Sequence, residues 1–177
     1  MKLLEKMLTL KFWLVLIGEI LFATAIFTAL STWQEQDMLD SDSAMPTLSA
    51  SSLKGTMYQF PEALNKSKKT LVYFFAPWCN ICHLSIGNLN ILRNQISDED
   101  LSIIIVALDW KSKAEVEEFI ADHDLNYPVL LGDEKWQQQY KIKGFPSYYV
   151  LNQQGEVLSR SMGYSSSIGM LRRIILQ

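Results

Sequence analysis

The sequence predicts an α/β fold, in which a mixed central sheet is flanked by helices and preceded by one N-terminal transmembrane helix. Three features indicate it: an apolar block near the N-terminus, strand-like runs that alternate with helix-like runs, and a hairpin-like turn near the C-terminus. Strands joined first through helices and then by a hairpin need both parallel and antiparallel pairing, so the sheet should be mixed. A chain of 177 residues is long enough for one such domain and too short for two ordinary ones.

The apolar block covers residues 12–33 and predicts a membrane anchor. About 20 apolar residues, at roughly 1.5 Å per residue, span a hydrocarbon core of about 30 Å. Lys2, Lys6 and Lys11 precede the block and acidic residues follow it, and basic residues stay on the cytoplasmic side of a membrane. We therefore expect a single-pass protein of the bacterial inner membrane, with residues 1–11 in the cytoplasm and the C-terminal domain in the periplasm or outside.

Two features of the block leave alternatives open. Ala23, Thr24 and Ala25 resemble the small-residue cleavage site of a signal peptide. Because the apolar run continues past them to Leu30, an uncleaved anchor is the preferred interpretation, and either interpretation exports the domain. Glu19 lies within the span, where a carboxylate is either a relay or helix-pairing contact or a side chain that a single-pass anchor tolerates. A side chain that the anchor tolerates is the preferred interpretation of Glu19.

The polar stretch 34–43 predicts a short tether, and residues 44–177 have the composition of a globular domain. The net charge of -3 argues against a nucleic-acid-binding protein, which would normally have a basic excess gathered on one face. The chain is therefore expected to bind no nucleic acid.

The first half of the domain predicts two buried strands and two helices. Residues 71–75 form a continuous apolar and aromatic run, typical of a strand buried on both faces, and residues 101–108 form a second one. A helix is expected from about residue 80 to residue 96. Ser112 opens the next helix, with Glu115 three residues later completing a capping box.

The second half predicts a short strand, a short helix, a hairpin and a final helix. These elements are expected at residues 127–131, 133–140, 147–151 with 156–161, and 165–176. Gly155 occupies the hairpin position that needs a positive φ.

The two cysteines of the chain are Cys79 and Cys82, in a Cys-x-x-Cys pattern between a predicted buried strand and a predicted helix. A thiol at a helix N-terminus faces unpaired N–H groups and the positive end of the helix dipole, and both favour the thiolate. Since the thiolate is the attacking species, Cys79 is the expected nucleophile. Cys82, one turn later, is expected to resolve the mixed disulfide by attacking Cys79.

Two other interpretations of the cysteine pair are weaker. Half of a zinc site also has this spacing, but no second cysteine pair exists and His83 and His123 are poorly spaced as ligands, so no metal is expected. An inert structural disulfide would close a loop too short to constrain the unfolded chain much. We expect no cofactor beyond the redox-active disulfide Cys79–Cys82.

Three segments carry a resemblance to a known family. Residues 74–82 (FFAPWCNIC) resemble the active-site segment of the thioredoxin superfamily, and residues 144–147 (GFPS) are similar to its cis-proline loop. Gly163, after the last predicted strand, matches a glycine that such domains often carry beside the site. The additional helix, strand and helix between Leu108 and Gly144, together with the anchor, resemble the TlpA-like branch of membrane-anchored thiol–disulfide oxidoreductases. Members of that branch serve cytochrome c maturation, copper-site assembly or protein disulfide repair.

The resemblance implies a substrate-binding groove around the cysteine pair. Pro146 would be cis, and Phe145 would present its backbone to an extended client segment that pairs as an added strand. Trp78 would pack beside Cys79 and shape access to it.

Some positions depart from the family pattern. Tyr73 stands where thioredoxins place a buried aspartate that moves a proton at the second cysteine, and Gly87 stands where relatives have a helix-kinking proline. Asp109 is either a replacement for that aspartate or, as preferred here, a solvated loop carboxylate. His83 either tunes the thiolate or moves protons, or is a solvent-facing helix residue, which is preferred. His123 is expected at the edge of the core.

The leading hypothesis is an enzyme, a protein-disulfide oxidoreductase that reduces disulfides of exported client proteins and is recycled by a membrane electron donor. A disulfide-forming oxidase or isomerase would use the same residues, and a tethered binding module with a rarely used cysteine pair is a third possibility. Peroxidases of the superfamily set Pro and Thr ahead of a single attacking cysteine, a pattern that this sequence lacks.

Overall fold

The structure is a computed structural model that describes residues 2–61 and 67–177, without the side chains of residues 2–10 and of Ser31. The chain divides into two compact units, Met1–Gln34 and Glu35–Gln177. The side chains of Lys2 and Lys6, two of the charges expected on the inner side of the membrane, lie outside the described residues.

One helix, α1 (Lys2–Glu35), makes up almost the whole of the first unit. Its part Lys11–Glu35 is long and apolar enough to cross a membrane, and none of it is buried within the protein. The hydroxyls of Thr24, Thr28 and Thr32 donate to backbone carbonyls one turn earlier, at 2.6–2.9 Å, so these polar groups are satisfied inside the helix. The helix is thus a candidate membrane span.

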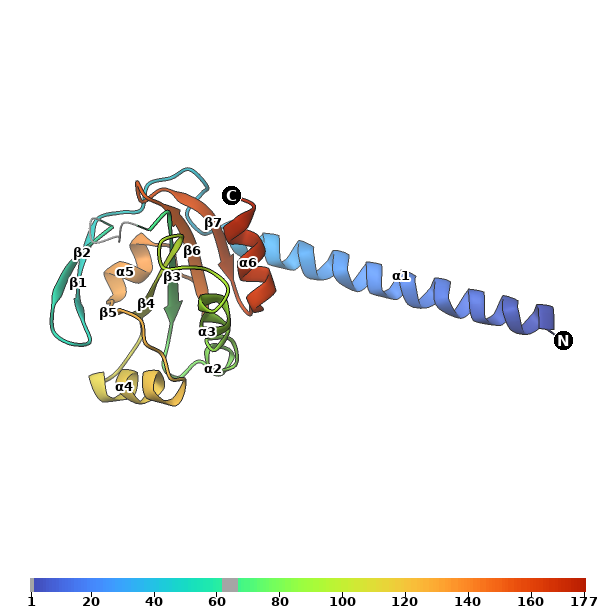
Figure 1. The fold of residues 1–177 in the computed structure, drawn as a ribbon, viewed down its shortest axis with the longest axis horizontal. Coiled ribbons are helices and arrows are strands. Elements are labelled where there is room, and N and C mark those ends of the chain that lie inside the picture. The colour runs from blue at the N-terminus through green and yellow to red at the C-terminus, as the bar shows by residue number, and fades with distance from the viewer. Residues whose placement is uncertain (1, 62–66) are drawn as a thin grey trace. The chain divides into compact units, whose positions relative to one another are not determined.

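The second unit is built on a seven-stranded mixed sheet (Figure 1). Its strands are β1 (Leu48–Ser52), β2 (Met57–Phe60), β3 (Lys69–Phe75), β4 (Leu101–Ala107), β5 (Val129–Leu131), β6 (Ser147–Asn152) and β7 (Val157–Met162). The order across the sheet is β2-β1-β5-β4-β3-β6-β7. The β3–β4 and β4–β5 pairs are parallel and the other pairs are antiparallel, which confirms the predicted mixed sheet.

Five helices cover the sheet in the part of the chain that the structure describes, and three of them begin at a polar cap. They are α2 (Asn80–Ser85), α3 (Asn88–Arg93), α4 (Lys113–Asp122), α5 (Glu134–Gln139) and α6 (Ser167–Ile175). Ser112, Asp133 and Ser166 cap α4, α5 and α6, each accepting a backbone N–H three residues on. The predicted cap at Ser112 is therefore confirmed.

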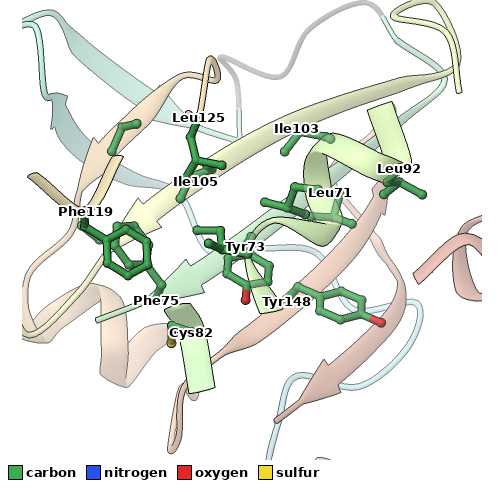
Figure 2. Packing of buried hydrophobic residues seen from close by; sticks show 14 of the residues in the cluster. Leu71, Tyr73, Phe75, Cys82, Leu92, Ile103, Ile105, Phe119, Leu125 and Tyr148 are labelled. Atoms are coloured by element: carbon green, nitrogen blue, oxygen red, sulfur yellow. The ribbon is translucent and has the colours of Figure 1, made fainter. Parts of the chain in front are cut away.

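Two apolar cores lie on opposite faces of the sheet, because successive side chains of a strand point to opposite sides. On β3, Leu71, Tyr73 and Phe75 face the core that α2, α3, α4 and α6 cover (Figure 2). Val72 and Phe74 face the second core, which α5 covers together with the segment before β1. This double burial explains why β3 and β4 are almost continuously apolar.

The hairpin formed by β1 and β2 was not predicted. Its sequence is rich in serine and carries a weak apolar alternation, so the local pattern resembles a loop. Gly55, with φ of 89°, makes the turn, and β1 pairs with β5 on its other side. Pairing with β5 is what makes this segment a strand.

The single helix expected over residues 80–96 is two helices, α2 and α3, that meet at Gly87. Glycine is a poor helix former, and the hydrogen bond from the Ile91 N–H to the Gly87 carbonyl is long, at 3.5 Å. The break therefore persists although no proline is present.

The stretch 34–43, predicted as a tether, packs on the domain over part of its length. Met38 is fully buried and Leu39 is 9% exposed, and the Leu39 N–H donates to the hydroxyl of Tyr149 at 3.0 Å. The guanidinium of Arg160 donates to the Met38 carbonyl at 3.2 Å and to the Asp40 carboxylate at 2.9 Å. Two apolar side chains in a mostly polar stretch are enough to dock it on the second core.

Candidate active site

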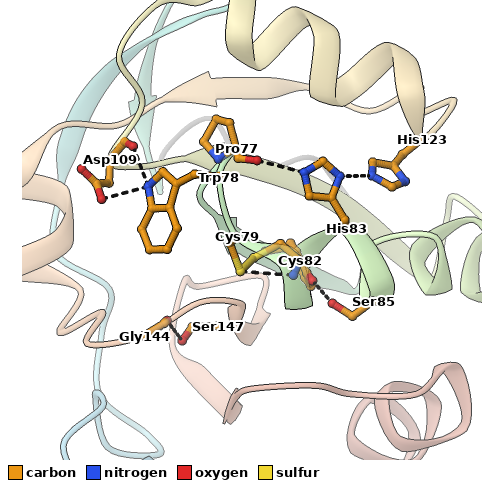
Figure 3. The surroundings of a disulfide bond; sticks show 11 residues. Pro77, Trp78, Cys79, Cys82, His83, Ser85, Asp109, His123, Gly144 and Ser147 are labelled. Carbon is orange, nitrogen blue, oxygen red and sulfur yellow. Dashed lines mark hydrogen bonds between the residues drawn. A yellow bond between two sulfur atoms is a disulfide. The ribbon is translucent and has the colours of Figure 1, made fainter.

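The cysteine pair lies where β3 passes into α2 (Figure 3). Cys79 is the N-cap of α2, with an extended backbone, and its Sγ accepts the Cys82 N–H at 3.1 Å. The two cysteines form a disulfide, with their Cα atoms 5.2 Å apart. Cys82 is fully buried whereas Cys79 is 6% exposed, so Cys79 alone of the pair reaches the surface. A donor aimed at the sulfur of Cys79 stabilises a thiolate there once the disulfide is reduced.

The ring of Trp78 is exposed and lies beside the cysteine pair (Figure 3). Its indole N–H donates to Asp109, at 3.1 Å from the backbone carbonyl and 3.0 Å from the carboxylate. Its ring stands edge-on to the ring of Phe145, with centroids 6.0 Å apart. Asp109 is an exposed loop residue, as preferred from the sequence, and its carboxylate is engaged by Trp78 rather than directed at Cys82.

The loop that carries Phe145 and Pro146 precedes β6, the strand next to β3. The Phe145–Pro146 peptide bond is cis, as the resemblance implied. The Gly163 N–H donates to the Pro146 carbonyl at 2.7 Å, and the Ser147 hydroxyl donates to the Gly144 carbonyl at 2.7 Å. Thus Gly163 lies at this loop, and Phe145 packs against the core that contains both cysteines.

Beneath the pair, Tyr73 occupies the position of the aspartate expected in thioredoxins. Its ring is fully buried, and its hydroxyl lies 2.7 Å from the Ser85 Oγ on α2, one turn after Cys82. Burial raises the pKa of the Tyr73 phenol far above its ordinary value. The group therefore stays protonated at working pH and is no base for the Cys82 thiol.

His83 is half-buried, and the preferred prediction of a solvent-facing residue is wrong. Its Nδ1 lies 2.8 Å from Nε2 of His123, and its Nε2 lies 3.0 Å from the Pro77 carbonyl. Both rings contact Phe119 on α4, with centroid distances of 4.4 Å and 4.9 Å. His123 lies at the core edge as predicted. Burial first, and then the neighbouring His83, lower the pKa of His123.

This histidine pair is the feature of the site that the sequence did not reveal. His83 and His123 are 40 residues apart, on α2 and at the end of α4, and no local pattern connects them. The Ser85 partner of Tyr73 was missed for the same reason.

The segment from Cys79 to His83 also has the C-x-x-C-H spacing of covalent haem attachment. That attachment needs both thiols and a free ring nitrogen to reach one ligand. Here Cys82 is fully buried and both ring nitrogens of His83 are hydrogen-bonded, so the geometry fits a dithiol site better. Among the residues that the structure describes, no group of three or more His, Cys, Asp or Glu side chains could hold a metal ion.

Comparison with known proteins agrees with this geometry. The family model described as AhpC/TSA family matches residues 42–160. The thioredoxin-like protein YneN of Bacillus subtilis is 25% identical over 135 residues, which cover 74% of this chain and 76% of that protein. The sporulation thiol-disulfide oxidoreductase A of the same organism is 24% identical, over 56% of this chain and 62% of that protein.

The fold has matches among solved structures as well. The thioredoxin domain of a thiol-disulfide oxidoreductase from Bacteroides vulgatus superposes with a TM-score of 0.67 and 19% identity. The superposition covers 77% of this chain and 99% of that domain. The fold of the second unit is therefore thioredoxin-like.

Proposed function

The chain belongs to the AhpC/TSA family, and on that premise we propose that it is a membrane-anchored enzyme that reduces disulfides of extracytoplasmic proteins. Three of its relatives are thiol–disulfide oxidoreductases, and the proposal places this chain in the same functional class. The observation that carries the proposal is the unequal pair: Cys79 reaches the surface at the N-cap of α2, and Cys82 is fully buried behind it.

The reaction transfers two electrons from the enzyme dithiol to a client disulfide. The Cys79 thiolate attacks one client sulfur, the client S–S bond breaks, and the second client sulfur leaves as a thiolate that takes up a proton. Cys82 then loses its proton and attacks the Cys79 sulfur, which forms the enzyme disulfide and releases the other client thiolate. A membrane electron donor reduces the enzyme disulfide again.

The client is expected to bind along the loop at Phe145 and Pro146. An extended client segment would pair with the backbone there as an added strand, since such pairing supplies affinity without demanding one sequence. The rings of Trp78 and Phe145, edge to face, would line the groove next to Cys79. Helix α1 would hold the domain at the outer face of the bacterial inner membrane, because its part Lys11–Glu35 is long and apolar enough to cross the hydrocarbon core.

A trapping experiment tests the chemistry. In Cys82→Ala, the mixed disulfide between Cys79 and the client has no internal thiol to release it, so adducts should accumulate that reducing agent removes. The double variant Cys79→Ala/Cys82→Ala is the matched control and should form none. Equal adduct levels in both variants would mean that the pair does not turn over.

The redox state of the pair in intact cells tests the direction. Alkylation trapping followed by a gel shift should find Cys79 and Cys82 mostly reduced, because a reductase needs a donor that keeps it so. A mostly oxidised pair would contradict the reductase proposal and would favour an oxidase.

A further inference from the structure

Both histidines of the chain meet at one place, and the mechanism above uses neither. His83 is on α2, the helix that Cys79 caps, and His123 lies beside it at the end of α4 (Figure 3). The ring of Phe119 packs on both histidine rings. The contacts of their ring nitrogens determine where the protons are.

The Pro77 carbonyl can only accept a hydrogen bond, so Nε2 of His83 must carry a proton. A neutral imidazole carries one ring proton, so Nδ1 of His83 must accept, and Nε2 of His123 must donate to it across the 2.8 Å contact. In the neutral pair, both rings therefore hold their proton on Nε2.

One added proton reverses the central hydrogen bond. The added proton binds Nδ1 of His123, and the proton on Nε2 of His123 passes to Nδ1 of His83, which then donates to Nε2 of His123. A second added proton would set two N–H donors against each other at 2.8 Å. The pair therefore holds one positive charge and opposes a second.

Both N–H groups of a charged His83 ring have acceptors, the Pro77 carbonyl and Nε2 of His123, so these contacts favour the charge on His83. Burial and the field of His83 both lower the pKa of His123, which disfavours the charge on that ring. The carboxylate of Asp122 on α4 raises the pKa of His123, and this effect is smaller than the two that lower it. The carboxylate of Asp109 accepts a hydrogen bond from Trp78.

This charge lies one helical turn from the nucleophile. The His83 N–H donates to the Cys79 carbonyl at 3.2 Å, and residues four apart on a helix have Cβ atoms about 5–6 Å from each other. The first turn of α2 contains no acidic residue to offset the charge. We infer that His83 and His123 are a proton-sharing pair that positions a single positive charge beside Cys79 and stabilises its thiolate in the reduced enzyme.

This inference rests on the proposed function, since only a reduced, attacking Cys79 benefits from the charge. The benefit is present at pH values where the pair holds its proton and is lost as the pH rises through the pKa of the pair. A unit charge about 6–10 Å away in water-like surroundings changes the ratio of thiolate to thiol by about two- to threefold. His83 and His123 would thus be positioning residues of the dithiol site.

Ring ¹⁵N NMR of the full chain in detergent micelles tests the pair directly. Only two histidines contribute signals, and His83→Gln assigns them. We expect both rings protonated on Nε2 at high pH, and, on acidification, a charged His83 beside a neutral His123 that has moved its proton to Nδ1. Independent titration of the two rings, or a neutral His83 protonated on Nδ1, would overturn the inference.

The pH dependence of Cys79 alkylation by iodoacetamide tests the effect on the thiolate. At a pH where NMR shows the wild-type pair to be charged, the ratio of thiolate to thiol in reduced His83→Gln should be about two- to threefold below that of the wild type. His123→Leu removes the acceptor of the charged ring, so it should lose the enhancement near the midpoint of the wild-type ring titration and keep it at a pH well below that midpoint. His123→Gln, whose amide oxygen accepts the same hydrogen bond, should restore it.

Insulin disulfide reduction by the wild type, measured in parallel, separates the two proposals. An unchanged Cys79 pKa in His83→Gln and His123→Leu, with an active wild type, refutes the proton-sharing inference alone. An inactive wild type whose rings titrate as expected refutes the proposed function alone.

Discussion

Replacing Tyr73 by phenylalanine separates the structural role of its hydroxyl from a catalytic one. The substitution keeps the ring and leaves no large cavity, and it deletes only the hydrogen bond to the Ser85 Oγ at 2.7 Å. Both residues are fully buried beneath the cysteine pair, so water does not replace the lost partner. Figure 2 shows Tyr73 pointing from β3 toward the helix that carries Cys82.

The expected loss of stability depends on the Ser85 hydroxyl, which the substitution leaves without its hydrogen-bond partner. A buried hydrogen bond contributes about 0.5–1.5 kcal/mol net, and a partner left without a hydrogen bond costs about 1–3 kcal/mol. We therefore expect Tyr73→Phe to lower the free energy of unfolding by about 1–2 kcal/mol. For a domain of roughly 150 residues, this corresponds to a fall in Tm of about 2–8 °C. The double variant with Ser85→Ala removes the orphaned hydroxyl too, and should recover about half of the loss.

Urea denaturation followed by tryptophan fluorescence, on the wild type, both single variants and the double variant, completes a double-mutant cycle. Losses that simply add would refute the coupling between Tyr73 and Ser85. Insulin reduction is assayed in the same proteins. Because the phenol keeps its proton, its removal should change the rate by less than about twofold and leave the pH profile as it is. A tenfold slower Tyr73→Phe protein that remains folded would refute our conclusion that Tyr73 is not the base.

Two further predictions concern the stability of the domain. Met38→Ala should lower the free energy of unfolding, measured by urea denaturation, by about 2–4 kcal/mol, because Met38 is fully buried. The control Met57→Ala, at a side chain that is 65% exposed, should lower it by less than about 0.5 kcal/mol. Equal effects of the two substitutions would mean that the segment before β1 is not docked. Burial raises the pKa of Tyr149 to about 12, so above pH 10 the unfolded chain loses a proton that the folded protein keeps. The free energy of unfolding should then fall by about 1.4 kcal/mol per pH unit between pH 10 and 12 for each such tyrosine. The fall should be smaller in Tyr149→Phe. A free energy of unfolding that stays constant from pH 8 to 11 would contradict this.

The sequence alone was sufficient for features whose signal is local. The continuous apolar runs at β3 and β4 indicated two-sided burial, and the position of Cys79 and Cys82 between a strand and a helix pointed to the candidate site. The turn at Gly155, with φ of 79°, followed from residue type in the same way. In each case, neighbours within one turn or one strand decide the conformation.

The tertiary structure decided the features that depend on distant partners. The serine-rich β1–β2 hairpin is a strand pair because β5 offers it an edge, and Met38 is buried because the second core has room for it. His83 has no local reason to turn inward; His123, 40 residues later, supplies the partner for its ring. A hydrogen bond between two side chains depends on where the chain brings their backbones, and that placement is a property of the packed sheet and helices as a whole.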